Sequence, residues 1–282
     1  MNHSGQLSVR RSDLEHRLGI SAGYGTAVNT GFAGIIALLA TVFIFTILYF
    51  LPENWFKSML MERGPTQYIA VFLGMWCAVI LVIKRRKLSV QASAIPTNII
   101  PEGGEFVLTS QTADVLIENI YTVSEDPERF ILFNRILTAI ANLKNLGRVS
   151  DVDEILRSVG ERDESAHQTS FAMLNGFLWA IPVLGFIGTV LGLAKSIGQF
   201  SSLLQKDSEM TQLIDSLKNV TSGLSTAFET TLLALAIALF VQLWATSQKK
   251  AEEDFLDSCH DYCLKNIVNR IRILAFEEQR QI

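Results

Sequence analysis

The sequence has few charged residues. Asp, Glu, Lys and Arg make up 18% of its 282 residues, whereas hydrophobic residues make up 49%. With a mean hydropathy of +0.30, this balance is unusual for a soluble globular domain and predicts an integral membrane protein. The net charge of −4 is small, so it gives no reason to expect a nucleic acid or an anionic substrate as a partner.

Cysteine is also scarce. The three cysteines are Cys77, Cys259 and Cys263, and the first lies in an apolar run. They are too few and too badly placed to form a disulfide scaffold. We therefore expect the soluble parts of the chain to lie in a reducing compartment.

Recognisable catalytic motifs are missing as well. No glycine-rich phosphate loop precedes a helix, and no cluster of nucleophile, base and orienting residue can be identified. Cys259 and Cys263 flank His260 and Asp261, but a metal site needs more convergent ligands than these. We predict that the protein is not an enzyme and holds no cofactor or metal.

What the sequence does contain is long apolar runs. About 20 apolar residues in a helix span the hydrocarbon core of a bilayer, and four runs reach this length. The prediction is an all-α membrane protein with four transmembrane helices, the third and fourth of them extended into the cytoplasm. The predicted spans are residues 31–51, 66–83, 171–197 and 223–245.

The basic residues predict the orientation of these spans. Lys84-Arg85-Arg86-Lys87 directly follows the second span, whereas the loop of residues 52–65 holds only Lys57 and Arg63. Cytoplasmic flanks carry an excess of Lys and Arg, so both chain ends should be cytoplasmic. The cytoplasmic parts would then be an N-terminal segment (1–30), a helical region (84–170) and a C-terminal helix (246–282).

Within the region 84–170 the sequence predicts three helices. The first covers about residues 112–121. The second begins where Asp126 can cap and Pro127 occupies the first helical position, and it runs to Gly147. The third, residues 152–170, should continue straight into the third span.

Small residues form a stripe on each of the last two spans. On the third span they are Pro182, Gly185, Thr189, Gly192 and Ser196, and on the fourth they begin with Ala227, Thr231 and Ala234. Spacings of three and four place each set on one face of a helix. At about 1.5 Å per residue, both threonines lie some 12 Å from the same end of their spans, and hence at one depth.

Two interpretations of these stripes remain open. They can line a narrow, weakly polar path. Alternatively, they are packing faces on which the threonines hydrogen-bond to their own backbone carbonyls.

The same residues resemble a known family. Ala180-Ile181-Pro182 followed by Gly185-Phe186-Ile187-Gly188-Thr189-Val190-Leu191-Gly192, together with Ala227 through Thr231 to Leu235, is similar to the motifs of the MotA/TolQ/ExbB proton-channel family. The resemblance covers roughly residues 151–250. It implies a homopentamer in the bacterial inner membrane around a dimer of a single-span MotB/TolR/ExbD-like partner, whose membrane carboxylate picks up H+ or Na+.

The resemblance also implies roles for individual residues. Thr189 and Thr231 would line the ion path beside that carboxylate, and Pro182 would be the proline of the central helix. The small residues around them, Gly185, Gly192, Ala227 and Ala234, would belong to the same lining. The resemblance thus favours the lining interpretation over simple packing.

Some features depart from any one branch of the family. The topology, with four spans and a large loop between the second and third, resembles that of the flagellar stators. The amino-acid sequence of the motifs is closer to TolQ and ExbB. The charged residues by which flagellar stators exert torque have no clear match here; Arg129, Arg135 and Glu118 are only candidates. The resemblance therefore indicates the ion-driven unit but not the process that it drives.

Glu229 is the one acidic residue well inside a predicted span. An acid in a membrane is a functional candidate by default. It lies two residues from Thr231, about 200° around the helix, so it should point away from the lining. We expect a contact with Lys195, as an accessory charged pair, or with another subunit; direct ion relay by Glu229 is the alternative.

These observations predict the ring-forming subunit of a proton- or sodium-driven motor of the inner membrane, which couples ion flow to rotation or mechanical work. The alternative is a membrane scaffold whose cytoplasmic helices recruit a partner without ion conduction. A secondary transporter is disfavoured because no internal repeat is visible.

Overall fold

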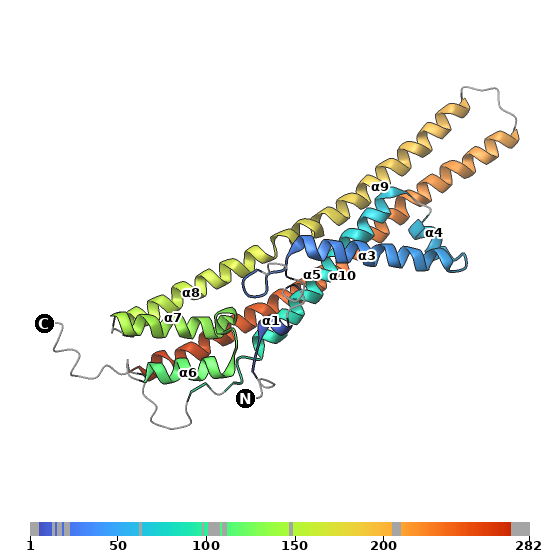
Figure 1. Cartoon of the computed structure of the whole chain (residues 1–282). Helices are drawn as coiled ribbons and strands as arrows, with labels where there is room; N and C mark the ends of the chain where they lie inside the picture. The colour runs from blue at the N-terminus through green and yellow to red at the C-terminus, as the bar shows by residue number, and fades with distance from the viewer. Residues whose placement is uncertain are drawn as a thin grey trace. The chain divides into compact units, whose positions relative to one another are not determined.

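The computed structural model is built from helices (Figure 1). In the residues that it describes, the only other pairing consists of two isolated β-bridges, so the predicted all-α class is confirmed. The described residues are 6–12, 15, 19, 23–61, 64–97, 99–100, 108, 112–146, 149–204 and 210–271.

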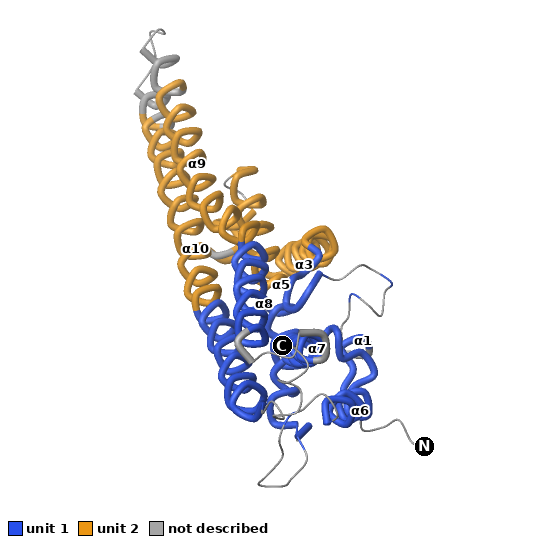
Figure 2. The backbone as a smooth tube through the Cα atoms, turned by 90° about the vertical axis from the view of Figure 1, so that its left-hand side faces the viewer, with its two compact units in different colours: residues 1–29, 82–171, 247–282 blue, residues 30–81, 172–246 orange. Residues whose placement is uncertain are grey.

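The chain divides into two compact units (Figure 2). Unit 1 comprises residues 1–29, 82–171 and 247–282, and unit 2 comprises residues 30–81 and 172–246. Two helices, α5 (Pro65–Ala92) and α10 (Met210–Asn266), contribute residues to both units.

Unit 2 contains the apolar helices. Besides its parts of α5 and α10, it holds α3 (Thr30–Phe50), α4 (Trp55–Met61) and α9 (Ala172–Leu204). Among the residues that the structure describes, four helices are long and apolar enough to cross a membrane, and the four predicted spans fall on α3, α5, α9 and α10. The protein is thus a membrane protein.

Large apolar side chains remain exposed on these helices. On α3, Leu39 is 65% exposed and Phe43 is 66% exposed, and Phe228 and Phe240 of α10 are 65% and 73% exposed. A soluble domain would bury such residues, whereas lipid or another subunit can cover them.

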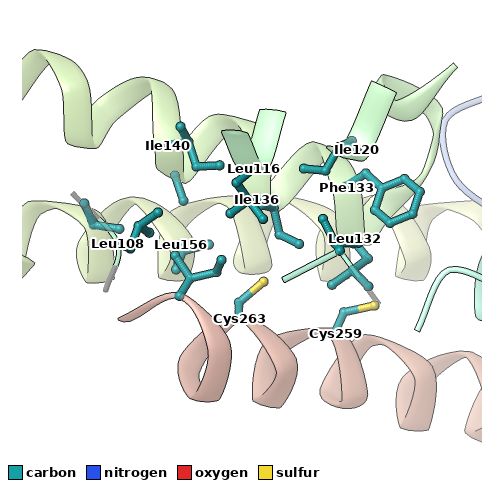
Figure 3. Packing of buried hydrophobic residues seen from close by; sticks show 14 of the residues in the cluster. Leu108, Leu116, Ile120, Leu132, Phe133, Ile136, Ile140, Leu156, Cys259 and Cys263 are labelled. Atoms are coloured by element: carbon teal, nitrogen blue, oxygen red, sulfur yellow. The ribbon is translucent and has the colours of Figure 1, made fainter. Parts of the chain in front are cut away.

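Unit 1 has its own hydrophobic core (Figure 3). Its helices are α1 (Val9–Ser12), α6 (Ala113–Val123), α7 (Ile131–Leu146) and α8 (Val149–Ser170), with short 3₁₀ turns η1 (Pro127–Arg129) and η2 (Val268–Arg270). Apolar residues at helical spacing meet in this core: Leu116 and Ile120 of α6, Phe133, Ile136 and Ile140 of α7, Leu156 of α8, and Cys259 and Cys263 of α10.

The prediction of a single helix from Pro127 to Gly147 was wrong. Pro127 begins a 3₁₀ turn, Phe130 is extended, and α7 starts at Ile131. Asp126 does not cap this turn, because its carboxylate accepts hydrogen bonds from the backbone N–H groups of Val9 (3.1 Å) and Arg10 (3.0 Å). Gly147 lies outside the described residues.

Two further boundaries differ from the prediction. The C-terminal helix expected over residues 246–282 ends at Asn266, and Ile271 pairs with Leu108 instead. Residues 272–282 lie outside the described part. On the other side of the last two spans, predicted as 171–197 and 223–245, both helices extend further than predicted, since α9 continues to Leu204 and α10 begins at Met210.

Candidate functional site

The two stripes of small residues meet face to face in unit 2. Gly185 of α9 lies opposite Ala234 and Thr231 of α10, and Gly192 lies opposite Ala227. Residue numbers increase along α9 where they decrease along α10, so the two helices are antiparallel here. Small residues allow this approach, because a larger side chain would hold the two backbones apart.

The contact leaves little room for a Cβ atom. A Cβ added to Gly185 would lie 2.7 Å from the Cβ of Ala234 and 3.2 Å from the Cα of Thr231. At Gly192 it would lie 2.9 Å from the Cβ of Ala227. Glycine is therefore required at these two positions by the backbone-to-backbone distance between α9 and α10.

Thr189 and Thr231 lie at the same level of this contact. Their hydroxyl groups are hydrogen-bonded to each other. Thr231 also donates to the carbonyl of Gly185 (2.9 Å), and the Thr189 hydroxyl lies 3.2 Å from the carbonyls of Gly185 and Ala227. Both side chains are half-buried, so one edge of the hydroxyl pair faces away from the helix contact.

The geometry bears on both interpretations of the stripes. Within one chain, the small residues are a packing face. Thr189 hydrogen-bonds to a carbonyl of its own helix, as the packing interpretation expects, whereas Thr231 donates to Gly185 of the other helix. The edge of the hydroxyl pair that stays accessible is the part of the stripes that another chain could approach. Pro182 is half-buried inside α9, three residues before Gly185, where it cannot donate a backbone hydrogen bond.

A polar cavity lies beside this contact, within unit 2. It has a volume of about 440 Å³. Its lining includes Gly188 and Lys195 of α9, Thr226 and Ser222 of α10, and Thr66 of α5. The cavity is large enough to hold several water molecules.

Glu229 and Lys195 are the predicted accessory charged pair. Glu229 is half-buried and accepts a hydrogen bond from the hydroxyl of Ser225, 2.9 Å away. Lys195 instead borders the polar cavity. The accessory pair therefore stays a prediction for the assembled protein.

The candidates for torque residues lie in unit 1, in different surroundings. Arg135 is 2% exposed, and its Nε donates to Asp163 Oδ2 at 2.7 Å. It is therefore part of the interior and cannot touch a second protein. Glu118 is exposed on α6, whereas Arg129 is half-buried and its carbonyl accepts a hydrogen bond from Gln91.

Tyr24 is 40% exposed, but its hydroxyl is part-buried and donates to Asp163 Oδ1 at 3.1 Å. Its burial and the negative charge of Asp163 raise the pKa of Tyr24 above its ordinary value. The phenol therefore stays protonated as a donor at neutral pH.

Unit 1 also contains a buried cluster of charges, which we call the Glu252 cluster: Lys84 of α5, His167 of α8, Glu252 of α10 and Thr26 of the N-terminal segment. Glu252 is 2% exposed and Lys84 is fully buried. The Oε2 of Glu252 lies 3.2 Å from Lys84 Nζ, 3.0 Å from His167 Nδ1 and 2.6 Å from the Thr26 hydroxyl. Four chain segments thus meet at one carboxylate.

Burial lowers the pKa of Lys84 below its ordinary value, and the negative charge of Glu252 only partly opposes this effect. Its Nζ also donates to the Ser170 hydroxyl at 2.8 Å and lies 4.1 Å from the centre of the Phe171 ring. The second lysine of the basic run, Lys87, is buried too and pairs with Glu15. Only the middle residues of the run, Arg85 and Arg86, are exposed.

The Glu252 cluster was missed from the sequence, although a signal was present. Glu252 occupies the same face of α10 as Cys259 and Cys263, at spacings of seven and four residues. His167 likewise follows Leu156 and Asp163 along the buried face of α8. Burying a charged side chain costs free energy unless it is paired. A charged residue at a position where the helical repeat expects an apolar one could therefore have indicated a buried ion pair.

Residues 125–259 match the sequence model of the MotA/TolQ/ExbB proton channel family. No curated protein and no solved structure gave a match. The matched range includes α9, both threonines, and the residues His167 and Glu252 of the Glu252 cluster. Over residues 125–259, somewhat less than half of its length, this membrane protein is therefore similar to the MotA/TolQ/ExbB proton channel family.

Proposed function

We propose that this chain is the ring-forming subunit of an ion-driven motor in the bacterial inner membrane. Five copies would enclose a dimer of a single-span partner of the MotB/TolR/ExbD type, and ion flow between ring and partner would produce rotation or other mechanical work. The transported ion would be H+ or Na+, and both termini of the chain would be cytoplasmic.

The observation that carries this proposal is the hydroxyl pair of Thr189 and Thr231. Two hydroxyl groups sit at one level of an antiparallel helix contact, in a region that is similar to a family of proton channels. Gly185, Gly192, Ala227 and Ala234 are buried in this contact and allow the two helices to approach closely. A carboxylate on a partner helix could reach the part of these two half-buried threonine side chains that the contact leaves exposed.

The polar cavity supports a water-filled approach to this level. It is lined by hydroxyl groups and by Lys195 and lies next to Gly188, one residue from Thr189. Water in such a cavity could supply protons to a carboxylate at the hydroxyl pair. Ion movement would then need the partner, because the chain places no acid of its own on the stripe of small residues.

The energy available is sufficient for work. One elementary charge that crosses about 150 mV releases roughly 3.5 kcal/mol. This exceeds thermal energy several-fold, so a leak through an unpartnered ring would be wasteful. The need for a partner carboxylate would prevent it.

The proposal can be tested with the complex purified together with its single-span partner and reconstituted into liposomes. Thr189→Val and Thr231→Val remove the hydroxyl groups and keep the side-chain shape. We expect the double variant to lose at least tenfold in potential-driven ion uptake while the complex keeps its size.

Thr46→Val is the matched control, since Thr46 lies on α3 and its hydroxyl donates to the Val42 carbonyl of the same helix. It should conduct normally. Full activity of the double threonine variant would refute the lining. A complex that forms normally but never conducts, even unmutated, would favour the scaffold alternative.

A further inference from the structure

The polar cavity of unit 2 offers hydrogen-bond donors and one positive charge. Its volume of about 440 Å³ falls within the range of about 300–1,000 Å³ that small-molecule sites have. Its polar lining consists of Lys195, Asn219 and the hydroxyl groups of Thr66, Ser222 and Thr226. Among the residues that the structure describes, no carboxylate lines it. Such a lining suits an anion better than a cation.

Lys195 supplies the positive charge. Its side chain is exposed, and it forms no ion pair with a carboxylate in the described part of the chain. It lies two residues before the end of the predicted third span (171–197), which places it at the depth of the lipid headgroups. A charge at the edge of a membrane is most stable beside an opposite charge.

Thr66 directs a second polar group into the same cavity. The residue is 8% exposed, and its hydroxyl forms no hydrogen bond with any residue that the structure describes. Its Oγ1 lies 3.0 Å from the position that a Cβ on Gly188 would take, and Gly188 lines the cavity too. Leaving a buried hydroxyl without a partner costs free energy, so an acceptor that enters the cavity would be stabilised here.

The first turn of α5 borders the cavity as well. Pro65 and Thr66 are the first two residues of this helix, and both line the cavity. The N–H groups of a first turn have no partner within their helix and carry a partial positive charge, so they favour an anion. Gly64, which precedes the helix, has no side chain that could cap them. Lysine, hydroxyl and helix terminus thus favour negative charge at one place.

Exposed apolar surface of α9 adjoins the cavity. Leu191 lines the cavity and is 54% exposed, and Ile187, about one helical turn earlier, is 41% exposed. Acyl chains can cover such side chains, whereas a free anion cannot. The surroundings suit a ligand that combines a charged head with apolar chains.

We propose that the polar cavity of unit 2 binds a phosphate group, held by the ammonium of Lys195, the hydroxyl of Thr66 and the first turn of α5. A phospholipid headgroup and free inorganic phosphate share this chemistry, and the exposed Leu191 and the depth of Lys195 favour the lipid. The bound phosphate would neutralise Lys195, whose charge otherwise repels H+ or Na+ from the water in this cavity. The site needs neither a partner protein nor ion flow, so it stands whether or not the motor function holds.

Titration of the purified full chain in detergent tests the site, with short-chain phosphatidylglycerol and inorganic phosphate as separate probes. Binding is measured from the rise in melting temperature with probe concentration and from lipid adducts in native mass spectrometry. Lys195→Gln should weaken binding by about tenfold or more, whereas Lys195→Arg keeps the charge and should stay within about threefold of the unchanged chain. Thr66→Val removes the hydroxyl, keeps the side-chain shape and should weaken binding roughly threefold to tenfold.

Two matched controls change the same residue types on α10 outside the cavity lining. Lys218 is exposed, and the hydroxyl of Thr221 donates to the Leu217 carbonyl of its own helix at 2.8 Å. Lys218→Gln and Thr221→Val should leave binding unchanged.

The two probes distinguish the sources of the phosphate. Lipid that binds more tightly than inorganic phosphate and is displaced by it would assign a headgroup, whereas equally tight binding of inorganic phosphate would assign the free anion to the same site. The proposal would be overturned if neither probe bound saturably, which would leave Lys195 to the accessory pair with Glu229. It would also be overturned if Lys218→Gln weakened binding as much as Lys195→Gln, or if Thr66→Val had no effect.

Discussion

The close contact between α9 and α10 can be tested by one methyl group. Gly185→Ala places a Cβ 2.7 Å from the Cβ of Ala234, whereas ordinary contact begins at 3.4 Å, so the atoms must separate by about 0.7 Å. The second neighbour is the Cα of Thr231, at 3.2 Å, which is backbone and cannot rotate away. The two helices must therefore move apart.

The size of the effect follows from two opposing contributions. Overpacking costs about 1–3 kcal/mol, whereas replacing glycine by alanine inside a helix gains up to about 1 kcal/mol. Gly176→Ala is the matched control, because Gly176 lies on the same helix and a Cβ there meets nothing within 4 Å. The free energies of unfolding of the two variants should differ by about 1–3 kcal/mol, with Gly185→Ala the less stable.

Thermal unfolding of the purified chain in detergent measures this difference. At roughly 2–4 °C per kcal/mol, Gly185→Ala should melt between about 2 and 12 °C below Gly176→Ala. If Gly185→Ala melts at the same temperature as the control or above it, the backbones do not approach as described, and the level of the hydroxyl pair is wrong.

Two further predictions concern unit 1. Glu252→Gln leaves the buried Lys84 without its counter-charge and should lower the free energy of unfolding by about 3–5 kcal/mol, measured by thermal unfolding. The control Glu253→Gln should change it by less than about 1 kcal/mol, because Glu253 is half-exposed. Equal effects of the two variants would contradict the buried pairing. Asp126→Ala removes the acceptor of two backbone N–H groups. Amide hydrogen exchange in residues 6–12 should become roughly fivefold faster, which corresponds to a loss of about 1 kcal/mol of local stability. Unchanged exchange would show that Asp126 does not hold this segment.

Much of the membrane part could be predicted from the sequence, because its physics is local. The lengths of the apolar runs identified the four helices that can span a membrane. The recurrence of Gly185, Thr189 and Gly192 at three and four residues identified the face of α9 that meets α10. A helical period alone determines which residues share a face, so no knowledge of distant contacts was needed.

The charged interior of unit 1 could not be predicted in the same way. Lys84 and Glu252 are separated by 168 residues, and no local pattern pairs residues so far apart. The basic run that begins at Lys84 was interpreted through the positive-inside rule, although two of its four cations are buried in ion pairs. Asp126 failed as a helix cap for a similar reason, since the N–H groups it accepts are 116 and 117 residues away.

The composition of the complex in its native membrane tests the central claim most directly. Native mass spectrometry of the solubilised complex should give five chains of 31.3 kDa with two copies of a protein that has one membrane span and an acidic residue within it. A chain that is monomeric, or a ring that contains no single-span protein, would contradict the proposed motor.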